Sequence, residues 1–170
     1  VVNTNIFNTL QYLPEGYQEL EYIESTGTQY IDTGFKPSYN KSLEIKASYV
    51  NGECLFGVYS EETRIDSFDF NLFKTNVKNQ FQFDVGDNES KTYIYADYKE
   101  PHNYKTSSIY RNLTVDTDLY IDDELITTVS SYIELSKNMY LFAKNNNNED
   151  VASFGSWRIY EAKFYNKGIL

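Results

Sequence analysis

Residues 43–49 read Leu-Glu-Ile-Lys-Ala-Ser-Tyr, and this stretch decides the fold class. Apolar side chains occupy every second position, and charged or small polar side chains stand between them. A strand with one face in a core and the other in water has this period of two. The alternation returns at residues 68–72, 81–85 and 160–164, and an aromatic variant occupies residues 139–143. The chain is therefore predicted to be all-β.

Turn residues separate these alternating runs. Asn51-Gly52 predicts a hairpin between the run that ends near Val50 and the next one, because Asn and Gly both accept a positive φ. Asp122-Asp123 predicts a second tight hairpin, and residues 145–148, all Asn, predict a polar loop. Short strands separated by such turns are typical of a sandwich or a barrel.

The length of 170 residues fits one domain. Residues 1–12 have a weak pattern and are expected to form a linker from an upstream region, which leaves residues 13–170 as the domain. Helical spacing occurs only at residues 13–20, where Pro14 and Gly16 interrupt it. The segment that contains Leu20 and Tyr22 is therefore interpreted as a strand.

The charge of the chain excludes several partners. Lys plus Arg number 15 and Asp plus Glu number 25, so the net charge is -10. Nucleic acids and anionic lipid surfaces are polyanions, and an acidic protein is repelled by both. No apolar run approaches the ~20 residues that span a membrane. We expect neither nucleic-acid binding nor membrane insertion.

Cysteine and histidine are too rare for several kinds of site. The one cysteine, Cys54, excludes an internal disulfide and a thiolate-rich metal site. The one histidine, His102, excludes a two-histidine metal site. Neither residue lies in a recognisable nucleophile motif. No cofactor and no catalytic residue are predicted.

Aromatic residues make up 17% of the chain, with 17 Tyr, 11 Phe and 1 Trp. Tyr favours strands and combines an apolar ring with a polar tip. Two interpretations remain open. The tyrosines can fill half-exposed strand faces, or some of them can form a surface on which sugars stack.

Two stretches resemble a known group of domains. The first is LPEGYQELEYIESTGTQYIDTG at residues 13–34. The second begins with LYIDDELITT at Leu119, continues through NMYLFAKN at residues 138–145 and ends with SWRIYEAKFYNKG. Together they are similar to the concanavalin A-like, laminin-G-like domains of phage tail and receptor-binding proteins and of bacterial surface proteins.

The resemblance implies a jelly roll of two antiparallel sheets and a carbohydrate-binding or adhesive role. Asp122-Asp123 departs from the Asp-Gly that such domains usually have. They also run on past the position of Leu170, so the chain is expected to be trimmed at its C-terminus. Gly27 and Gly34 in the first stretch are predicted to adopt backbone conformations that side chains disfavour. No binding residue transfers from this group, because a fold does not fix a function.

Three glutamates raise the possibility of catalysis. Glu19, Glu21 and Glu24 spell E-x-E-x-x-E, which resembles the E-x-D-x-x-E signature of retaining glucanases with a jelly-roll fold. Such enzymes need two carboxylates about 5 Å apart, one as nucleophile and one as acid. The middle residue is Glu instead of Asp, so a solvent-facing strand is the preferred interpretation.

Two acidic loops contain oxygen ligands of the kind that calcium prefers. One loop holds Asp84, Asp87, Asn88 and Glu89, and the other holds residues 122–124. Neither matches a known calcium-binding repeat, so solvation explains these charges and no metal site is predicted.

The candidate ligand-binding residues combine rings with polar groups. Tyr98, His102 and Tyr104 lie around a loop expected at Pro101, and loops carry binding sites more often than strands do. Polar positions expected on one face or end of the sandwich complete the set, namely Tyr59, Asp69, Asn71, Asn146 and Asn147.

The preferred function is that of a non-catalytic carbohydrate-binding or adhesion module for a cell-surface glycan. It would belong to a larger phage tail or surface protein, contact other domains of that protein, and act on a virion or at a cell surface. A homo-oligomer is possible. One alternative is a structural or assembly domain that binds protein. The other is a glycoside hydrolase that uses Glu19 with Glu21 or Glu24.

Overall fold

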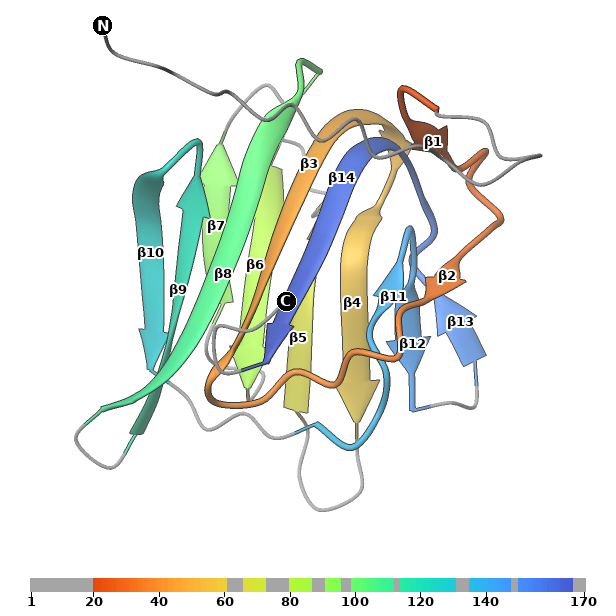
Figure 1. The fold of residues 1–170 in the computed structure, drawn as a ribbon. Helices are drawn as coiled ribbons and strands as arrows, with labels where there is room; N and C mark the ends of the chain where they lie inside the picture. The colour runs from red at the N-terminus through yellow and green to blue at the C-terminus, as the bar shows by residue number, and fades with distance from the viewer. Residues whose placement is uncertain are drawn as a thin grey trace, which may run out of the picture.

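The computed structural model describes residues 20–60, 66–72, 80–86, 91–95, 99–111, 114–130, 135–147 and 150–166. Every regular element in this part of the chain is a β-strand, and the strands form two sheets packed face to face (Figure 1). The prediction of an all-β sandwich is confirmed. The described residues contain no helix that is long and apolar enough to cross a membrane.

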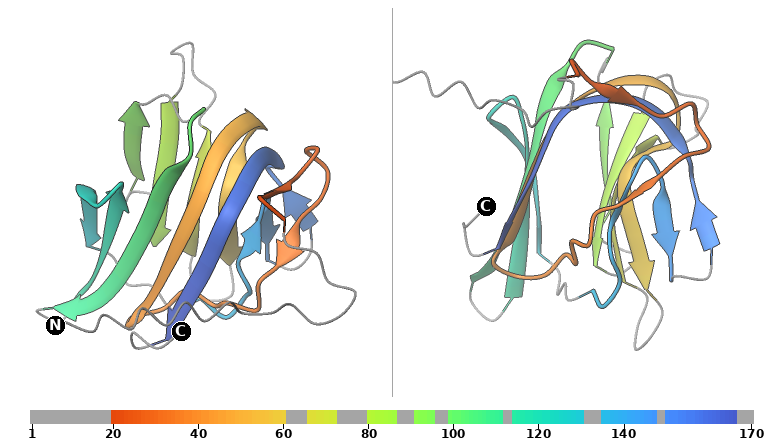
Figure 2. Two further views of the ribbon diagram at one scale, coloured as in Figure 1. Left: turned by 45° about the horizontal axis from the view of Figure 1, so that its top comes forward. Right: turned by 45° about the vertical axis from the view of Figure 1, so that its right-hand side comes forward.

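The sheets are called sheet A and sheet B. Sheet A has the order β1 (Ile23–Glu24), β14 (Gly155–Asn166), β3 (Lys41–Gly52), β8 (His102–Arg111), β9 (Thr114–Ile121), β10 (Glu124–Ser130). Sheet B has the order β13 (Asp150–Ala152), β12 (Lys144–Asn146), β4 (Cys54–Ser60), β5 (Asp66–Leu72), β6 (Gln80–Gly86), β7 (Lys91–Tyr95), and β11 (Tyr140–Leu141) joins β4 to β2 (Ile31–Asp32). Figure 2 shows β1 and β2 running along one side of the sandwich, where the two sheets meet.

The core lies between the inward faces of the two sheets. Leu43, Ile45 and Ala47 of β3 are completely buried, as the alternation predicts. From sheet B, Phe70 stacks on Phe81 with ring centroids 5.5 Å apart. Burying a side chain of this size stabilises the fold by about 1.5–3 kcal/mol. The alternating pattern is therefore a direct record of which strand face meets the core.

The hairpin predicted at Asp122-Asp123 is confirmed, because this pair joins β9 to β10. Both residues have a positive φ, 50° and 65°. A two-residue turn of this kind needs positive φ at both positions, and Asp tolerates it better than most residues. Gly27 and Gly34 also have a positive φ, as predicted, at 93° and 67°.

The hairpin predicted at Asn51-Gly52 is wrong, because the chain crosses here from sheet A to sheet B. Asn51 and Gly52 end β3 opposite Ser156 and Gly155 of β14. A Cβ atom on Gly155 would lie 2.2 Å from the carbonyl oxygen of Cys54. The glycines at this crossing therefore allow backbone segments to approach, which a local turn pattern cannot indicate.

Two further local predictions also need correction. Residues 144–146 form β12, parallel to β4, where a polar loop was expected. Asn145 is buried there, and its side-chain amide donates a hydrogen bond to the carbonyl oxygen of Asn138 (2.8 Å). Within the segment expected to be a strand around Leu20 and Tyr22, only residues 20–22 are described, and β1 begins after them. In the first case tertiary pairing overrides local propensity.

Candidate functional site

Tyr104, predicted to offer an exposed ring, is completely buried, so this prediction is wrong. It lies within β8 opposite Ile45 of β3 and Ile121 of β9, on the inward face of sheet A. Its ring centroid is 5.2 Å from that of Phe70. The expected loop around Pro101 ends one residue later, where β8 begins at His102. Tyr98 lies outside the described residues.

The side chain of His102 contacts the turn between β9 and β10. Its Nδ1 lies 2.6 Å from Oδ2 of Asp122, and the other carboxylate oxygen accepts the backbone N–H of Asn103 (2.8 Å). The Asn103 hydrogen bond, followed by His102, lowers the pKa of Asp122. Asp122, one of the acids considered for calcium binding, therefore has a structural role in which both of its carboxylate oxygens take part. The described residues contain no cluster of three or more His, Cys, Asp or Glu that could hold a metal ion.

Of the three glutamates considered for catalysis, Glu19 lies outside the described residues. Glu21 precedes β1 in the chain and is exposed. Glu24 belongs to β1, where its Oε2 lies 2.6 Å from Nε of Arg158 on the neighbouring strand. Glu24 thus lies at the edge of sheet A, in an exposed ion pair.

The register of sheet B places several of the predicted residues on its outer face. Asp69 lies opposite Gly57 on one side and opposite Asp84 on the other. Asn146 lies opposite Tyr59, and the backbone N–H of Asn147 donates to the carbonyl of Tyr59 (3.0 Å). Asn71 lies opposite Gln82. We call the set Tyr59, Asp69, Gln82, Asp84, Lys144 and Asn146 the polar face.

The polar face is largely sealed from water. The exposed fractions of Asp69, Gln82 and Asp84 are 0%, 5% and 3%. Nζ of Lys144 lies 2.8 Å from Oδ2 of Asp69, and Nε2 of Gln82 donates to Oδ2 of Asp84 (3.3 Å). Burial lowers the pKa of Lys144, but the Asp69 carboxylate outweighs it, so the pKa is raised. Lys144 is therefore a cation at neutral pH and neutralises a buried carboxylate.

Gly57 and Cys54 are packed closely against the Asp69–Lys144 ion pair. Gly57 lies between the ion-paired residues, and a Cβ atom there would lie 3.1 Å from Cβ of Asp69 and 3.2 Å from Cβ of Lys144. Burial raises the pKa of the Cys54 thiol well above its ordinary value, which keeps it protonated and unreactive. Only Tyr59, Lys144 and Asn146 of the polar face reach the solvent in part.

In the part of the chain that the structure describes, an accessible pair of stacked rings lies at the edge formed by β2 and β11. Tyr30 stacks on Tyr140 with ring centroids 4.6 Å apart and an angle of 21° between the planes. Tyr30 is 45% exposed, and Tyr140 is half-buried. Tyr140 lies opposite Asp32 in the β2–β11 pair, and Asn138 precedes β11. We call Tyr30, Asp32, Asn138 and Tyr140 the edge platform.

Hydrogen bonds hold the polar groups of the edge platform in place. Oδ1 of Asp32 accepts the backbone N–H of Gly34 (2.9 Å), and Oδ2 accepts Nδ2 of Asn138 (3.2 Å). The hydroxyl of Thr33 donates to the carbonyl of Met139 (2.6 Å), which ties the two segments together. Burial raises the pKa of Tyr140, so its phenol is neutral at physiological pH.

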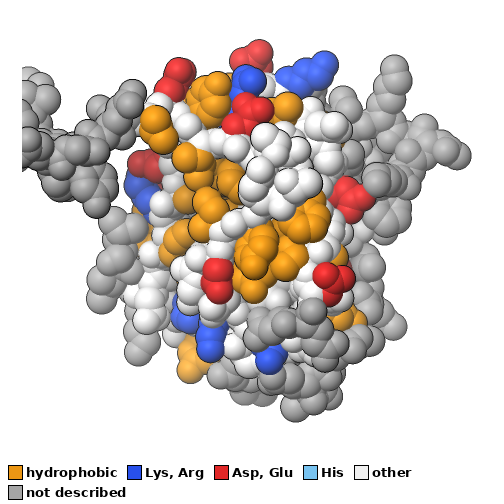
Figure 3. Space-filling view, turned by 90° about the vertical axis from the view of Figure 1, so that its right-hand side faces the viewer, with side chains coloured by type: hydrophobic (Ala, Val, Ile, Leu, Met, Phe, Trp, Pro, Cys, Tyr) orange, Lys and Arg blue, Asp and Glu red, His pale blue; other side chains and the backbone are white. Residues whose placement is uncertain are grey.

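Exposed apolar side chains lie on the same side of the molecule as the edge platform. Figure 3 looks at this side of the molecule and shows hydrophobic side chains gathered along it. Those from the N-terminal segment with large exposed fractions are Leu20, Tyr22, Ile23, Tyr30 and Ile31. An exposed ring with a fixed carboxylate and amide beside it can hold the C–H face of a sugar and bind its hydroxyl groups.

Sequence reasoning missed the edge platform. Residues 25–34 entered the prediction only through the family resemblance and the backbone of Gly27 and Gly34, although Tyr30 and Asp32 alternate as residues of one strand face do. It also noted the aromatic second face of residues 139–143 without using it. The pairing of Asp32 with Asn138 spans 106 residues, and no local pattern contains it.

Comparisons with known proteins support the fold. No protein-family model and no curated protein matches the chain. Among solved structures, a carbohydrate-binding module (CBM66) from Bacillus subtilis is similar, with a TM-score of 0.51, 12% identity, and 81% of each chain covered. A proposed beta-glucanase from Mycobacterium abscessus has a TM-score of 0.51 at 7% identity, with 80% of this chain and 68% of that one covered. The chain thus has a concanavalin A-like jelly-roll fold.

Proposed function

We propose that this chain is a non-catalytic carbohydrate-binding module that recognises a cell-surface glycan through the edge platform. The single observation that carries the proposal is the exposed Tyr30–Tyr140 stack beside a carboxylate held by two hydrogen bonds. The similarity to a carbohydrate-binding module supports it at the level of the fold. Within this proposal, the chain serves a larger phage tail or surface protein.

The chemistry of the platform suits a sugar ring. The outer face of the Tyr30 ring can receive the apolar C–H face of a pyranose, which water solvates poorly. Each oxygen of Asp32 already accepts one N–H and retains a second lone pair for a sugar hydroxyl. Because these groups are fixed before binding, little conformational entropy is lost when a ligand arrives.

A binding role is favoured over hydrolysis by the number of carboxylates. Retaining hydrolysis needs two carboxyl groups about 5 Å apart, one of them protonated. Asp32 is the only carboxylate among the four residues of the edge platform. Asp69 and Asp84 are opposite each other on the polar face, and this observation favours hydrolysis as the second candidate. Asp69, however, is neutralised by Lys144.

A glycan array followed by calorimetry tests the proposal. We expect at least one oligosaccharide to bind, and Tyr30→Ala to weaken its binding by about 1 kcal/mol or more. Tyr39→Ala is a matched control, because Tyr39 is exposed to a similar extent, 47%. Absence of glycan binding across the array, or equal losses in the two variants, would overturn the proposal.

The two alternatives have tests of their own. Release of reducing sugar from β-glucans by the wild type, abolished in Asp84→Asn, would establish hydrolysis instead. A protein assembly domain would bind no glycan on the array and would retain its partner when Tyr30 is replaced.

A further inference from the structure

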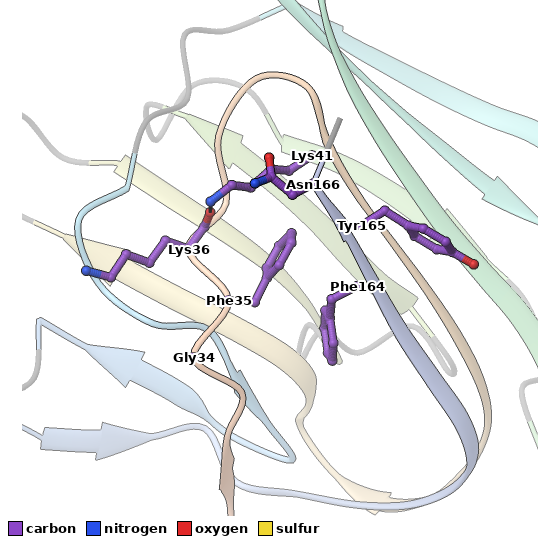
Figure 4. A pocket seen from close by; sticks show the side chains of 7 residues that line it. All are labelled: Gly34, Phe35, Lys36, Lys41, Phe164, Tyr165 and Asn166. Atoms are coloured by element: carbon purple, nitrogen blue, oxygen red, sulfur yellow. Dashed lines mark hydrogen bonds between the residues drawn. The ribbon is translucent and has the colours of Figure 1, made fainter. Parts of the chain in front are cut away.

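A hollow lies between residues 34–41, which follow β2 in the chain, and the end of β14. Its volume is about 370 Å³, within the range of roughly 300–1,000 Å³ that is common for small-molecule sites. It is lined by Gly34, Phe35, Lys36, Lys41, Phe164, Tyr165 and Asn166 (Figure 4). We call this hollow the lysine pocket.

Two aromatic rings and one ammonium group define the lysine pocket. The rings of Phe35 and Phe164 pack with their centroids 5.1 Å apart. Figure 4 shows Lys41 extending across the pocket, while the side chain of Lys36 extends away from the rings. Nζ of Lys41 donates to the carbonyl of Lys36 (2.7 Å) and lies 5.5 Å from the centroid of Phe35. The ammonium group keeps further N–H donors for a ligand.

The charge of the pocket is unusual for this acidic protein. Four other described cations lie against carboxylates, namely Lys105 with Glu44, Lys144 with Asp69, Arg158 with Glu24 and Lys163 with Glu161. Among the described residues that line the lysine pocket there is no Asp or Glu. Burial lowers the pKa of Lys41, and the Lys36 ammonium lowers it further. The charge of a bound anion would raise the pKa of Lys41 again and so offset both effects.

We propose that the lysine pocket binds a carboxylate-bearing sugar, with the carboxylate on Lys41 and the apolar face of the ring against Phe35 and Phe164. The ammonium group supplies a charge-assisted hydrogen bond, which is stronger than a neutral one. The rings provide the apolar surface that a simple inorganic anion cannot use. This site lies beyond the proposed function, because it uses none of the residues of the edge platform.

The test is a titration of ¹⁵N-labelled protein with glucuronate, glucose and acetate at constant ionic strength. We expect glucuronate to shift the amide signals of Phe35 and Phe164 to saturation, and glucose and acetate to bind far more weakly. Lys41→Gln is expected to weaken glucuronate binding about fivefold or more, as for a lost charge-assisted hydrogen bond. Lys46→Gln, an exposed lysine on the same strand, is the matched control and leaves it unchanged.

Three results would overturn the inference. Glucose binding as tightly as glucuronate would remove the role of the charge. Acetate binding as tightly would remove the role of the rings. Lack of saturation by glucuronate at about 10 mM, roughly ten times a Kd of about 1 mM, would remove the site itself. Tyr30→Ala leaves the glucuronate shifts intact, so failure of the edge platform is distinguishable from failure of the lysine pocket.

Discussion

The edge platform and the polar face contain the same kinds of side chain but differ in exposure. Each places a tyrosine, a carboxylate and an amide near one another. On the polar face the carboxylate of Asp69 is completely buried against Lys144, whereas at the edge Asp32 is exposed beside the stacked Tyr30. A buried ion pair contributes to the order of the fold, while an exposed ring next to fixed polar groups can meet a ligand. Exposure, more than residue type, separates the two regions.

The largest expected effect comes from breaking the ion pair of the polar face. Lys144→Ala leaves the Asp69 carboxylate buried without its cation, which should cost about 3–5 kcal/mol of unfolding free energy. Urea denaturation measures this. Lys105→Ala is the control, because its exposed pair with Glu44 should be worth at most ~1 kcal/mol. Equal losses in the two variants would mean that the polar face is not sealed.

Close packing of the polar face gives the next prediction. Gly57→Ala would bring a Cβ atom to 3.0 Å from Sγ of Cys54 and 3.1 Å from Cβ of Asp69. Overpacking of this kind usually costs about 1–3 kcal/mol, and denaturation can again measure it. An unchanged midpoint would show that the Asp69–Lys144 pair has room to move and would weaken the contrast with the edge platform.

The two regions also show how far the sequence can be read. Alternation at residues 43–49 correctly identified a strand and its buried face, because period two is a local property. It also placed Asp69 outside the core, but it could not show that the outer face of sheet B is itself buried. The prediction of an exposed Tyr104 ring was wrong because Pro101 indicated a loop that extends to Tyr104, whereas β8 already begins at His102. Pairings that span most of the chain, such as Asp32 with Asn138, leave no local signal.

A smaller effect is expected when the edge platform loses its charge. Asp32→Asn keeps the shape of the side chain but replaces one acceptor oxygen by an NH₂ donor. It removes one acceptor for sugar hydroxyls and one of the two exposed hydrogen bonds from Gly34 and Asn138. Affinity should fall by about 1 kcal/mol, the typical net value of a hydrogen bond, and the loss of stability should not exceed about the same amount. Calorimetry with the glycan that binds best on the array provides the affinity. A large loss of stability in this variant would instead assign Asp32 a structural role like that of Asp69.

The smallest effect concerns alkaline pH. The folded-state pKa of Lys144 is raised above its ordinary value of 10.5, so its contribution to stability is complete below that pH. The contribution is lost as pH rises through the raised folded pKa. The stability difference between wild type and Lys144→Met should therefore be constant from neutral pH to about 10 and should shrink above it. A difference that stays constant throughout would separate the stability from this charge.

Calorimetry on two single variants tests the assignment of glycan binding to the exposed region most directly. Tyr30→Ala removes the outer ring of the edge platform, and Tyr59→Ala removes the tyrosine of the polar face. With the best oligosaccharide from the array, Tyr30→Ala is predicted to weaken binding by about 1 kcal/mol or more, roughly fivefold or greater, and Tyr59→Ala to leave it unchanged. Loss of binding in Tyr59→Ala, with wild-type affinity in Tyr30→Ala, would contradict the account and place the glycan on the polar face.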